Sequence, residues 1–121
     1  MVMEYKTTIT KLGESYQDMF DEGLVVVFNE GAPAELAELS ALHTPDKLPE
    51  DVKRGDEVHL GGNCYFVTAV GSEANYTLRK MGHCTFVFTG ADKAELNGHI
   101  VLKGPGMPDI KIGSRFEIYL R

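Results

Sequence analysis

Short stretches of strand-forming residues recur along the whole chain, and glycine-bearing turns separate them. The stretches that we predict to form strands are 2–12, 24–28, 57–60, 65–70, 83–89, 99–102 and 115–120. Most have the alternating or continuous apolar pattern of a strand. Strands at this spacing in 121 residues predict a mainly β fold, a small closed or nearly closed barrel with two or three short helices, because closure removes exposed sheet edges. A β-sandwich is the alternative.

Two short helices are expected between these strands because each has a start signal and a glycine after its end. Ser15 can cap the first helix, which Gly23 closes. Ser72 can cap another over residues 73–81, and Gly82 follows its last residue.

A third helix matters most because it leads to a histidine. Proline fits the first turn of a helix, so we expect this helix to begin at Pro33, and Leu36 and Leu39 then repeat at helical spacing. The helix cannot continue through Pro45. His43 would therefore stand where a rigid element ends, and we expect its ring to be open to solvent.

Composition narrows the class of protein. A chain of this length forms one domain, residues 1–121. It has 18 Asp and Glu against 12 Lys and Arg, a net charge of −6, which argues against a nucleic-acid partner. No apolar run approaches the roughly 18 residues of a membrane span, and the N-terminus lacks the pattern of a signal peptide. We therefore expect a cytoplasmic protein that does not itself span a membrane.

Histidines are the first candidates for chemistry. A neutral imidazole is both a nucleophile and a proton carrier near neutral pH, which makes His43 the candidate to take up and release a phosphoryl group. His83 could donate a hydrogen bond to a phosphoryl oxygen if it lies near His43. A structural histidine bonded to the backbone is the alternative for each ring.

Other kinds of site receive less support. Gly71 and Ser72 precede a helix, so N–H groups there are candidates to contact phosphate, with an ordinary helix start as the alternative. The histidines and the two cysteines, Cys64 and Cys84, could bind zinc. No pair has the close spacing of a structural site, so no metal is predicted and the cysteines are expected to be free thiols. No P-loop and no Gly-x-Ser-x-Gly motif is present, so neither a cofactor nor a hydrolase is indicated.

Short motifs follow one another in a characteristic order over nearly the whole chain. They are Thr7-Thr-Ile-Thr10, Phe28-x-x-Gly-Ala-Pro-Ala-x-Leu36, Leu42-His43, Val67-Thr-Ala-Val-Gly-Ser72, Leu78-x-x-x-Gly-His83, Phe88-x-Gly90 and Gly104-Pro105. Each motif is too short to identify a family alone. As an ordered set they resemble the glucitol/sorbitol-specific IIA component of the bacterial sugar phosphotransferase system.

This resemblance implies a cytoplasmic phosphoryl carrier. Such a carrier accepts phosphoryl from the histidine-containing phosphocarrier protein and passes it to a cysteine of the IIB component in a IIB/IIC sugar permease. The permease then phosphorylates glucitol/sorbitol or a related polyol during uptake. In the family the acceptor is the histidine after the Gly-Ala-Pro-Ala helix, which here is His43. The alternative from another class is a non-enzymatic β-barrel binding or regulatory module, in which His43 is structural.

Overall fold

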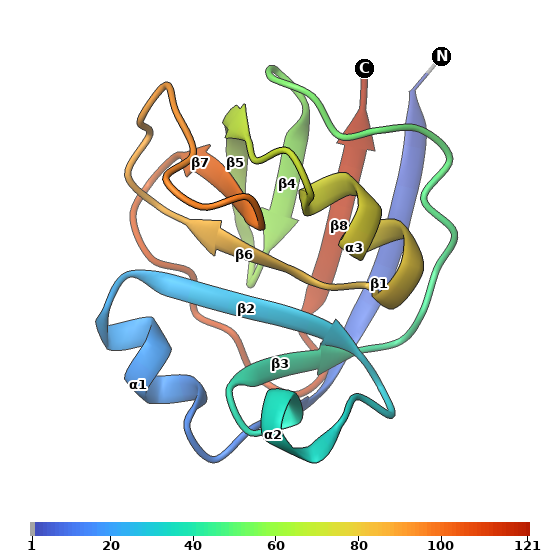
Figure 1. The fold of residues 1–121 in the computed structure, drawn as a ribbon, viewed down its shortest axis with the longest axis vertical. Helices are drawn as coiled ribbons and strands as arrows, with labels where there is room; N and C mark the ends of the chain where they lie inside the picture. The colour runs from blue at the N-terminus through green and yellow to red at the C-terminus, as the bar shows by residue number, and fades with distance from the viewer. Residues whose placement is uncertain (1) are drawn as a thin grey trace.

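The apolar patterns form eight strands that close on themselves. The computed structural model describes residues 2–121. Its strands are β1 (Met3–Leu12), β2 (Leu24–Asn29), β3 (Ser40–His43), β4 (Glu57–Leu60), β5 (Asn63–Val70), β6 (Cys84–Val87), β7 (His99–Lys103) and β8 (Arg115–Leu120). Around the barrel they follow the order β1-β3-β2-β6-β7-β5-β4-β8, and β8 pairs with β1 (Figure 1). The prediction of a closed barrel is therefore confirmed, and the sandwich is excluded.

Apolar side chains from the strands fill the barrel interior. In β8 the alternate residues Phe116, Ile118 and Leu120 are all buried. Each such side chain contributes about 1.5–3 kcal/mol by leaving water.

Both cysteines are free thiols, as predicted, and they differ in location. Cys84 is buried in the core, while Cys64 is exposed on the outer surface.

Two of the strand pairs are parallel. In one of them, a strand takes the place of the expected continuation of the third helix. The helix α2 (Ala34–Ala37) is a single turn in the crossover from β2 to the parallel strand β3. The prediction that this helix continues toward His43 is wrong: Leu36 is 39% exposed, and the chain re-enters the sheet at Ser40. Pairing with β2 overrides the helical spacing of the leucines, because β3 is buried along its whole length.

The other two helices lie outside the barrel where they were expected. They are α1 (Tyr16–Asp21) and α3 (Ala74–Met81). Neither helix has a side-chain hydrogen bond at its N-cap, so the predicted serine caps are wrong. The predicted end of α3 is confirmed, since Gly82 follows it in the left-handed conformation, with φ of 62°. No helix within residues 2–121 has the length and apolar character that crossing a membrane requires.

Candidate functional site

The histidine singled out from the sequence lies inside the barrel and not at an exposed helix end. His43 is the last residue of β3, and its register partner on the parallel strand β2 is Asn29. Its side chain packs against the core, with its ring 5.0 Å from the Phe116 ring in an edge-to-face contact. His43 is 0% exposed, so the prediction that this ring is open to solvent is wrong.

Both nitrogens of the buried ring face backbone carbonyl groups. His43 Nδ1 lies 2.8 Å from the carbonyl oxygen of Thr44, the next residue. His43 Nε2 lies 2.8 Å from the carbonyl oxygen of Gly82, in the turn that follows α3. Two segments that are distant in sequence thus hold the ring from opposite sides.

These two contacts conflict with the protonation state that burial favours. Burial lowers the pKa of His43, and the carbonyl groups of Thr44 and Gly82, together with the charge of Glu30, oppose this effect without overcoming it. The ring is therefore neutral at pH 7 and has one N–H group. It can donate to only one carbonyl, and the lone pair of its other nitrogen faces the second carbonyl oxygen unfavourably.

Gly82 is the residue that covers the ring, and only glycine fits there. A Cβ atom at this position would lie 2.8 Å from His43 Cε1 and would overlap Asn29 Oδ1. Its left-handed φ also disfavours any residue with a side chain. The α3–β6 turn can therefore approach the histidine closely because Gly82 has no side chain.

Asn29 adds an unpaired polar group to the same place. Its side-chain oxygen is buried and has no hydrogen-bond partner within residues 2–121. Buried polar atoms are rarely left unpaired, so this oxygen calls for an explanation. Sequence reasoning missed both Asn29 and Gly82 as members of the site, since only the parallel pairing and the turn after α3 bring them to His43.

His83 lies at the edge of this site, in the same turn as Gly82. Its ring is partly exposed and stacks on Phe28, with the ring centroids 4.6 Å apart. Its Nδ1 lies 3.1 Å from the carbonyl oxygen of Val27, to which an Nδ1–H group donates. That tautomer leaves a lone pair on Nε2. The ring of His83 thus packs on Phe28, and the chain connection to Gly82 is what links it to the His43 site.

The remaining predicted site residues, Gly71 and Ser72, lie elsewhere. They precede α3, whereas Gly82 follows it, and a helix of eight residues spans about 12 Å. They line a separate hollow that also includes Arg54 and Asn97. The structure therefore does not bring these N–H groups to His43.

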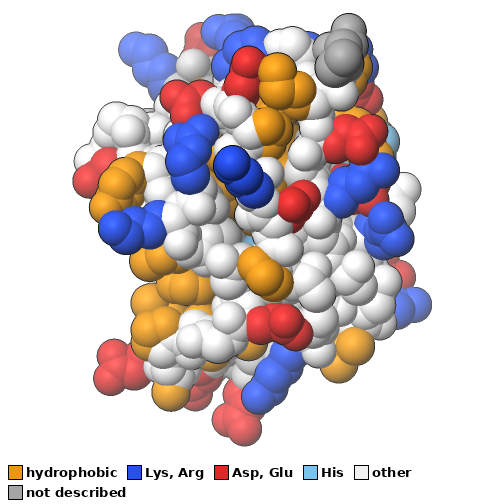
Figure 2. All heavy atoms as spheres, turned by 90° about the vertical axis from the view of Figure 1, so that its right-hand side faces the viewer, with side chains coloured by type: hydrophobic (Ala, Val, Ile, Leu, Met, Phe, Trp, Pro, Cys, Tyr) orange, Lys and Arg blue, Asp and Glu red, His pale blue; other side chains and the backbone are white. Residues whose placement is uncertain are grey.

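One side of the molecule carries charges of both signs. Figure 2 shows the right-hand side of the molecule as drawn in Figure 1, where the arrows of β2 and β3 point. Basic and acidic side chains are interspersed over this side. Small hydrophobic groups lie between them. This mixture differs from the basic face that nucleic acid requires.

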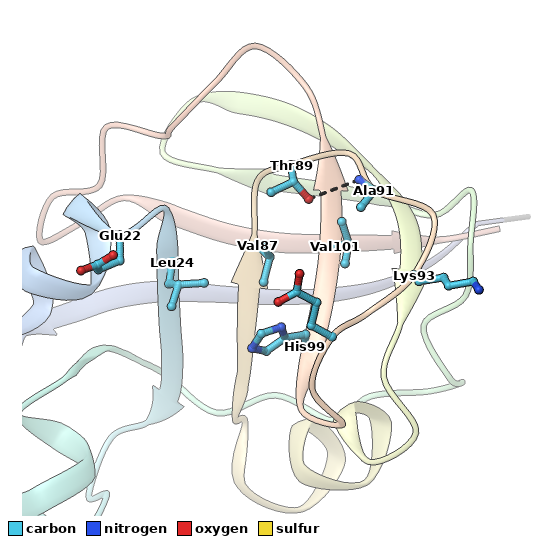
Figure 3. A pocket seen from close by; sticks show the side chains of 9 residues that line it. Glu22, Leu24, Val87, Thr89, Ala91, Lys93, His99 and Val101 are labelled. Atoms are coloured by element: carbon cyan, nitrogen blue, oxygen red, sulfur yellow. Dashed lines mark hydrogen bonds between the residues drawn. The ribbon is translucent and has the colours of Figure 1, made fainter.

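A further hollow of about 420 Å³ lies beside the parallel strands β6 and β7. Figure 3 shows that Lys93 points away from His99 across this hollow. Thr89 Oγ1 accepts a hydrogen bond of 3.2 Å from the N–H of Ala91 in the loop at its rim. Because its charged side chains do not converge on one point, this hollow is not the candidate site.

Comparisons with known proteins agree with the fold and cover nearly the whole chain. A model of the family "PTS system glucitol/sorbitol-specific IIA component" matches residues 4–117. Proteins of that description from Shigella flexneri and Escherichia coli K12 are each 40% identical over 119 residues, with 97% of both chains covered. The crystal structure of a PTS system IIA component from Enterococcus faecalis V583 matches with a TM-score of 0.82 and 27% identity, covering 93% of this chain and 97% of that one.

Proposed function

The chain belongs to the family of glucitol/sorbitol-specific IIA components of the phosphotransferase system, and from this premise we propose that it carries a phosphoryl group on His43. The donor is the phosphohistidine of the histidine-containing phosphocarrier protein, and the acceptor is a cysteine of the IIB component of a sugar permease. The sugar is glucitol/sorbitol or a related polyol. The exchange takes place in the cytoplasm. Family membership favours this role over a binding module that carries no phosphoryl group.

Both ring nitrogens lie 2.8 Å from a carbonyl oxygen, and we assign the reaction to Nε2 because the carbonyl that faces it belongs to the separate turn at Gly82, whereas Nδ1 faces the adjoining residue, Thr44. With its proton on Nδ1, His43 donates to the carbonyl of Thr44 and keeps the lone pair on Nε2. That lone pair attacks phosphorus as the donor's phosphorus–nitrogen bond breaks, and the donor ring keeps the electron pair. The Thr44 carbonyl then stabilises the positive charge that develops on the imidazole. This contact is the single observation that most supports the assignment.

The turn of Gly82 and His83 between α3 and β6 covers His43 Nε2 in the structure. Transfer therefore requires this turn to move. The neutral ring favours this movement because its Nε2 lone pair faces the carbonyl oxygen of Gly82 at 2.8 Å. The turn lies at the end of α3 and next to the partly exposed His83, so its displacement leaves the barrel intact. Opening would also let the amide of Asn29 rotate its NH₂ group toward a phosphoryl oxygen.

His83 is the helper in this mechanism and also the second candidate for the acceptor. When both ring nitrogens of His83 carry hydrogen, Nε2 can donate to a phosphoryl oxygen while Nδ1 stays bonded to Val27. The observation that favours His83 as the acceptor itself is that its ring is partly exposed and its Nε2 is unpaired within residues 2–121.

The test is to incubate the protein with phosphoenolpyruvate and the phosphorylated histidine-containing phosphocarrier protein. The position of the phosphate on this chain is then determined. We expect one acid-labile, base-stable phosphate per molecule, mapped by mass spectrometry to His43. His43→Gln should remove it, whereas His99→Gln, which removes a histidine outside the site, should keep it. Phosphate on His83, or full labelling of His43→Gln, would contradict the assignment of His43. Absence of any phosphate on the folded wild-type protein would contradict the carrier function.

A further inference from the structure

A second cluster of reactive side chains lies on the outer face of the barrel, away from His43. Glu57 and His59 are two residues apart on β4, so both point outward while Val58 between them is buried. Cys64 on β5 is the direct register partner of His59 across the hairpin. Figure 1 shows β4 between β5 and β8 in the barrel wall.

The donor atoms of these three side chains converge. Cys64 Sγ lies 3.3 Å from Glu57 Oε1 and 3.5 Å from His59 Nε2. His59 Nε2 lies 3.6 Å from Glu57 Oε1. Sulfur, nitrogen and oxygen ligands on a tetrahedral Zn²⁺ ion, with metal–ligand distances of about 2.0–2.3 Å, are about 3.3–3.6 Å from one another. The three atoms therefore already have the spacing of three corners of a zinc tetrahedron.

We propose that Glu57, His59 and Cys64 bind a divalent transition-metal ion of the zinc class. The set combines one thiolate, one imidazole and one carboxylate, which are the three ligand types that zinc accepts. The exposed side of Cys64 gives the ion a path from solvent, and the fourth position is open to water. On binding, the metal replaces the thiol proton that Cys64 Sγ donates to Glu57 Oε1, and that proton passes to solvent.

The surroundings hold the ligands in place. A two-residue turn of Gly61 and Gly62 fixes the hairpin register, so the spacing of the donor atoms follows from the sheet ladder. Arg121 forms an ion pair with the other carboxylate oxygen of Glu57, Oε2, which leaves Oε1 directed at the cluster. The Tyr119 ring lies against His59, with their centroids 4.6 Å apart. Such outer contacts commonly orient metal ligands.

The experiment is a titration of the tag-free, reduced and chelator-treated protein with Zn²⁺, followed by calorimetry. We expect one ion per chain and release of one proton. Co²⁺ should give a thiolate-to-metal charge-transfer absorption. Cys64→Ser should abolish that absorption and weaken Zn²⁺ binding by more than about 100-fold, because loss of an outer-shell partner alone costs about 10- to 100-fold. His99→Gln, a histidine outside the cluster, serves as the matched control and should bind Zn²⁺ as the wild type does.

Either of two results would overturn the proposal: no 1:1 complex in the wild type, or unchanged affinity in Cys64→Ser. Circular dichroism verifies that each variant is folded. The readout is independent of phosphoryl transfer, so a failure of this site and a failure of the carrier function are distinguishable.

Discussion

The two histidine sites of this barrel differ in which way the side chain points from its strand. His43 on β3 points into the barrel, where Gly82 and Thr44 cover both ring nitrogens. His59 on β4 points outward, where Glu57 and Cys64 flank its Nε2 and remain accessible. Side chains along a strand alternate between the two faces of the sheet. A shift of one residue in the strand register would therefore move an inward-pointing histidine to the outer face, and an outward-pointing one to the interior.

The direction of the side chain determines which molecules can reach each histidine. The inner site is covered by a turn that excludes water from the ring, so the proposed phosphoryl transfer requires this turn to open. The outer site is held by the ladder between two strands and needs no movement to receive an ion. The predictions below test this contrast between a covered ring and an open one.

The largest expected effect comes from Gly82→Ala, which should destabilise the folded state by about 2–4 kcal/mol. The new Cβ would collide with Asn29 and His43, and the left-handed backbone adds to the cost. Urea denaturation measures the change. Gly55→Ala is the matched control: its φ is 95° but nothing lies within 4 Å of a Cβ there, so it should cost only about 1 kcal/mol. Equal losses in the two variants would mean that the close approach at Gly82 has no energetic weight.

His83→Ala should slow phosphoryl transfer by about 10- to 100-fold with little effect on docking, because it removes a hydrogen bond to the transferring group. Rapid-quench measurements of the transfer rate against phosphocarrier concentration separate the two effects. A rate like that of the wild type would remove His83 from the mechanism.

Acid should destabilise the protein through His43. Its pKa is lowered in the folded state, so the unfolded chain takes up the proton first as the pH falls below about 6.5. Stability is therefore full above that pH and declines below it, with a slope of at most about 1.4 kcal/mol per pH unit for one proton. Urea midpoints from pH 8 to pH 5 measure the decline, which His43→Gln should reduce. If His59→Gln reduces it equally, burial of His43 is not its source.

The smallest effect is expected from Cys64→Ser in the absence of metal, which should change the free energy of unfolding by less than about 0.5 kcal/mol. The side chain is exposed and carries no core packing. Thermal unfolding with and without Zn²⁺ extends the measurement. Zn²⁺ should raise the wild-type midpoint and leave that of Cys64→Ser in place. A large loss in the metal-free variant would indicate a structural role for the thiol itself.

Local patterns in the sequence predicted most of the barrel because they agreed with its tertiary environment. The alternation in β8, the continuous apolar run of β2 and the glycine after α3 each led to the element that the structure contains. The segment around β3 is the exception. Leu36 and Leu39 have helical spacing, but parallel pairing with β2 decides the structure, and that pairing is not a local property.

The sites were less predictable than the strands for the same reason. The sequence singles out His43 as a candidate, but its burial depends on Gly82, which lies 39 residues further along the chain. His59 and Cys64 could have been paired from the sequence. A hairpin with a two-residue loop at Gly61 and Gly62 places residues 60 and 63, and then residues 59 and 64, opposite one another. Zinc-site motifs are defined by ligands that are close in sequence. Such motifs do not detect ligands that face one another on two adjacent strands.

The seam between β1 and β8 has a consequence for how this molecule is made. β8 pairs with both β1 and β4, so the wall of the barrel is incomplete until residue 120 has left the ribosome. Folding during synthesis can proceed only to an open sheet with two bare edges. The same seam places Met3 opposite Leu120 (Figure 1), so a short peptide linker could join the termini. A circular permutant opened at an exposed loop, such as that containing Gly31, would then translate β1 and β8 as one continuous hairpin.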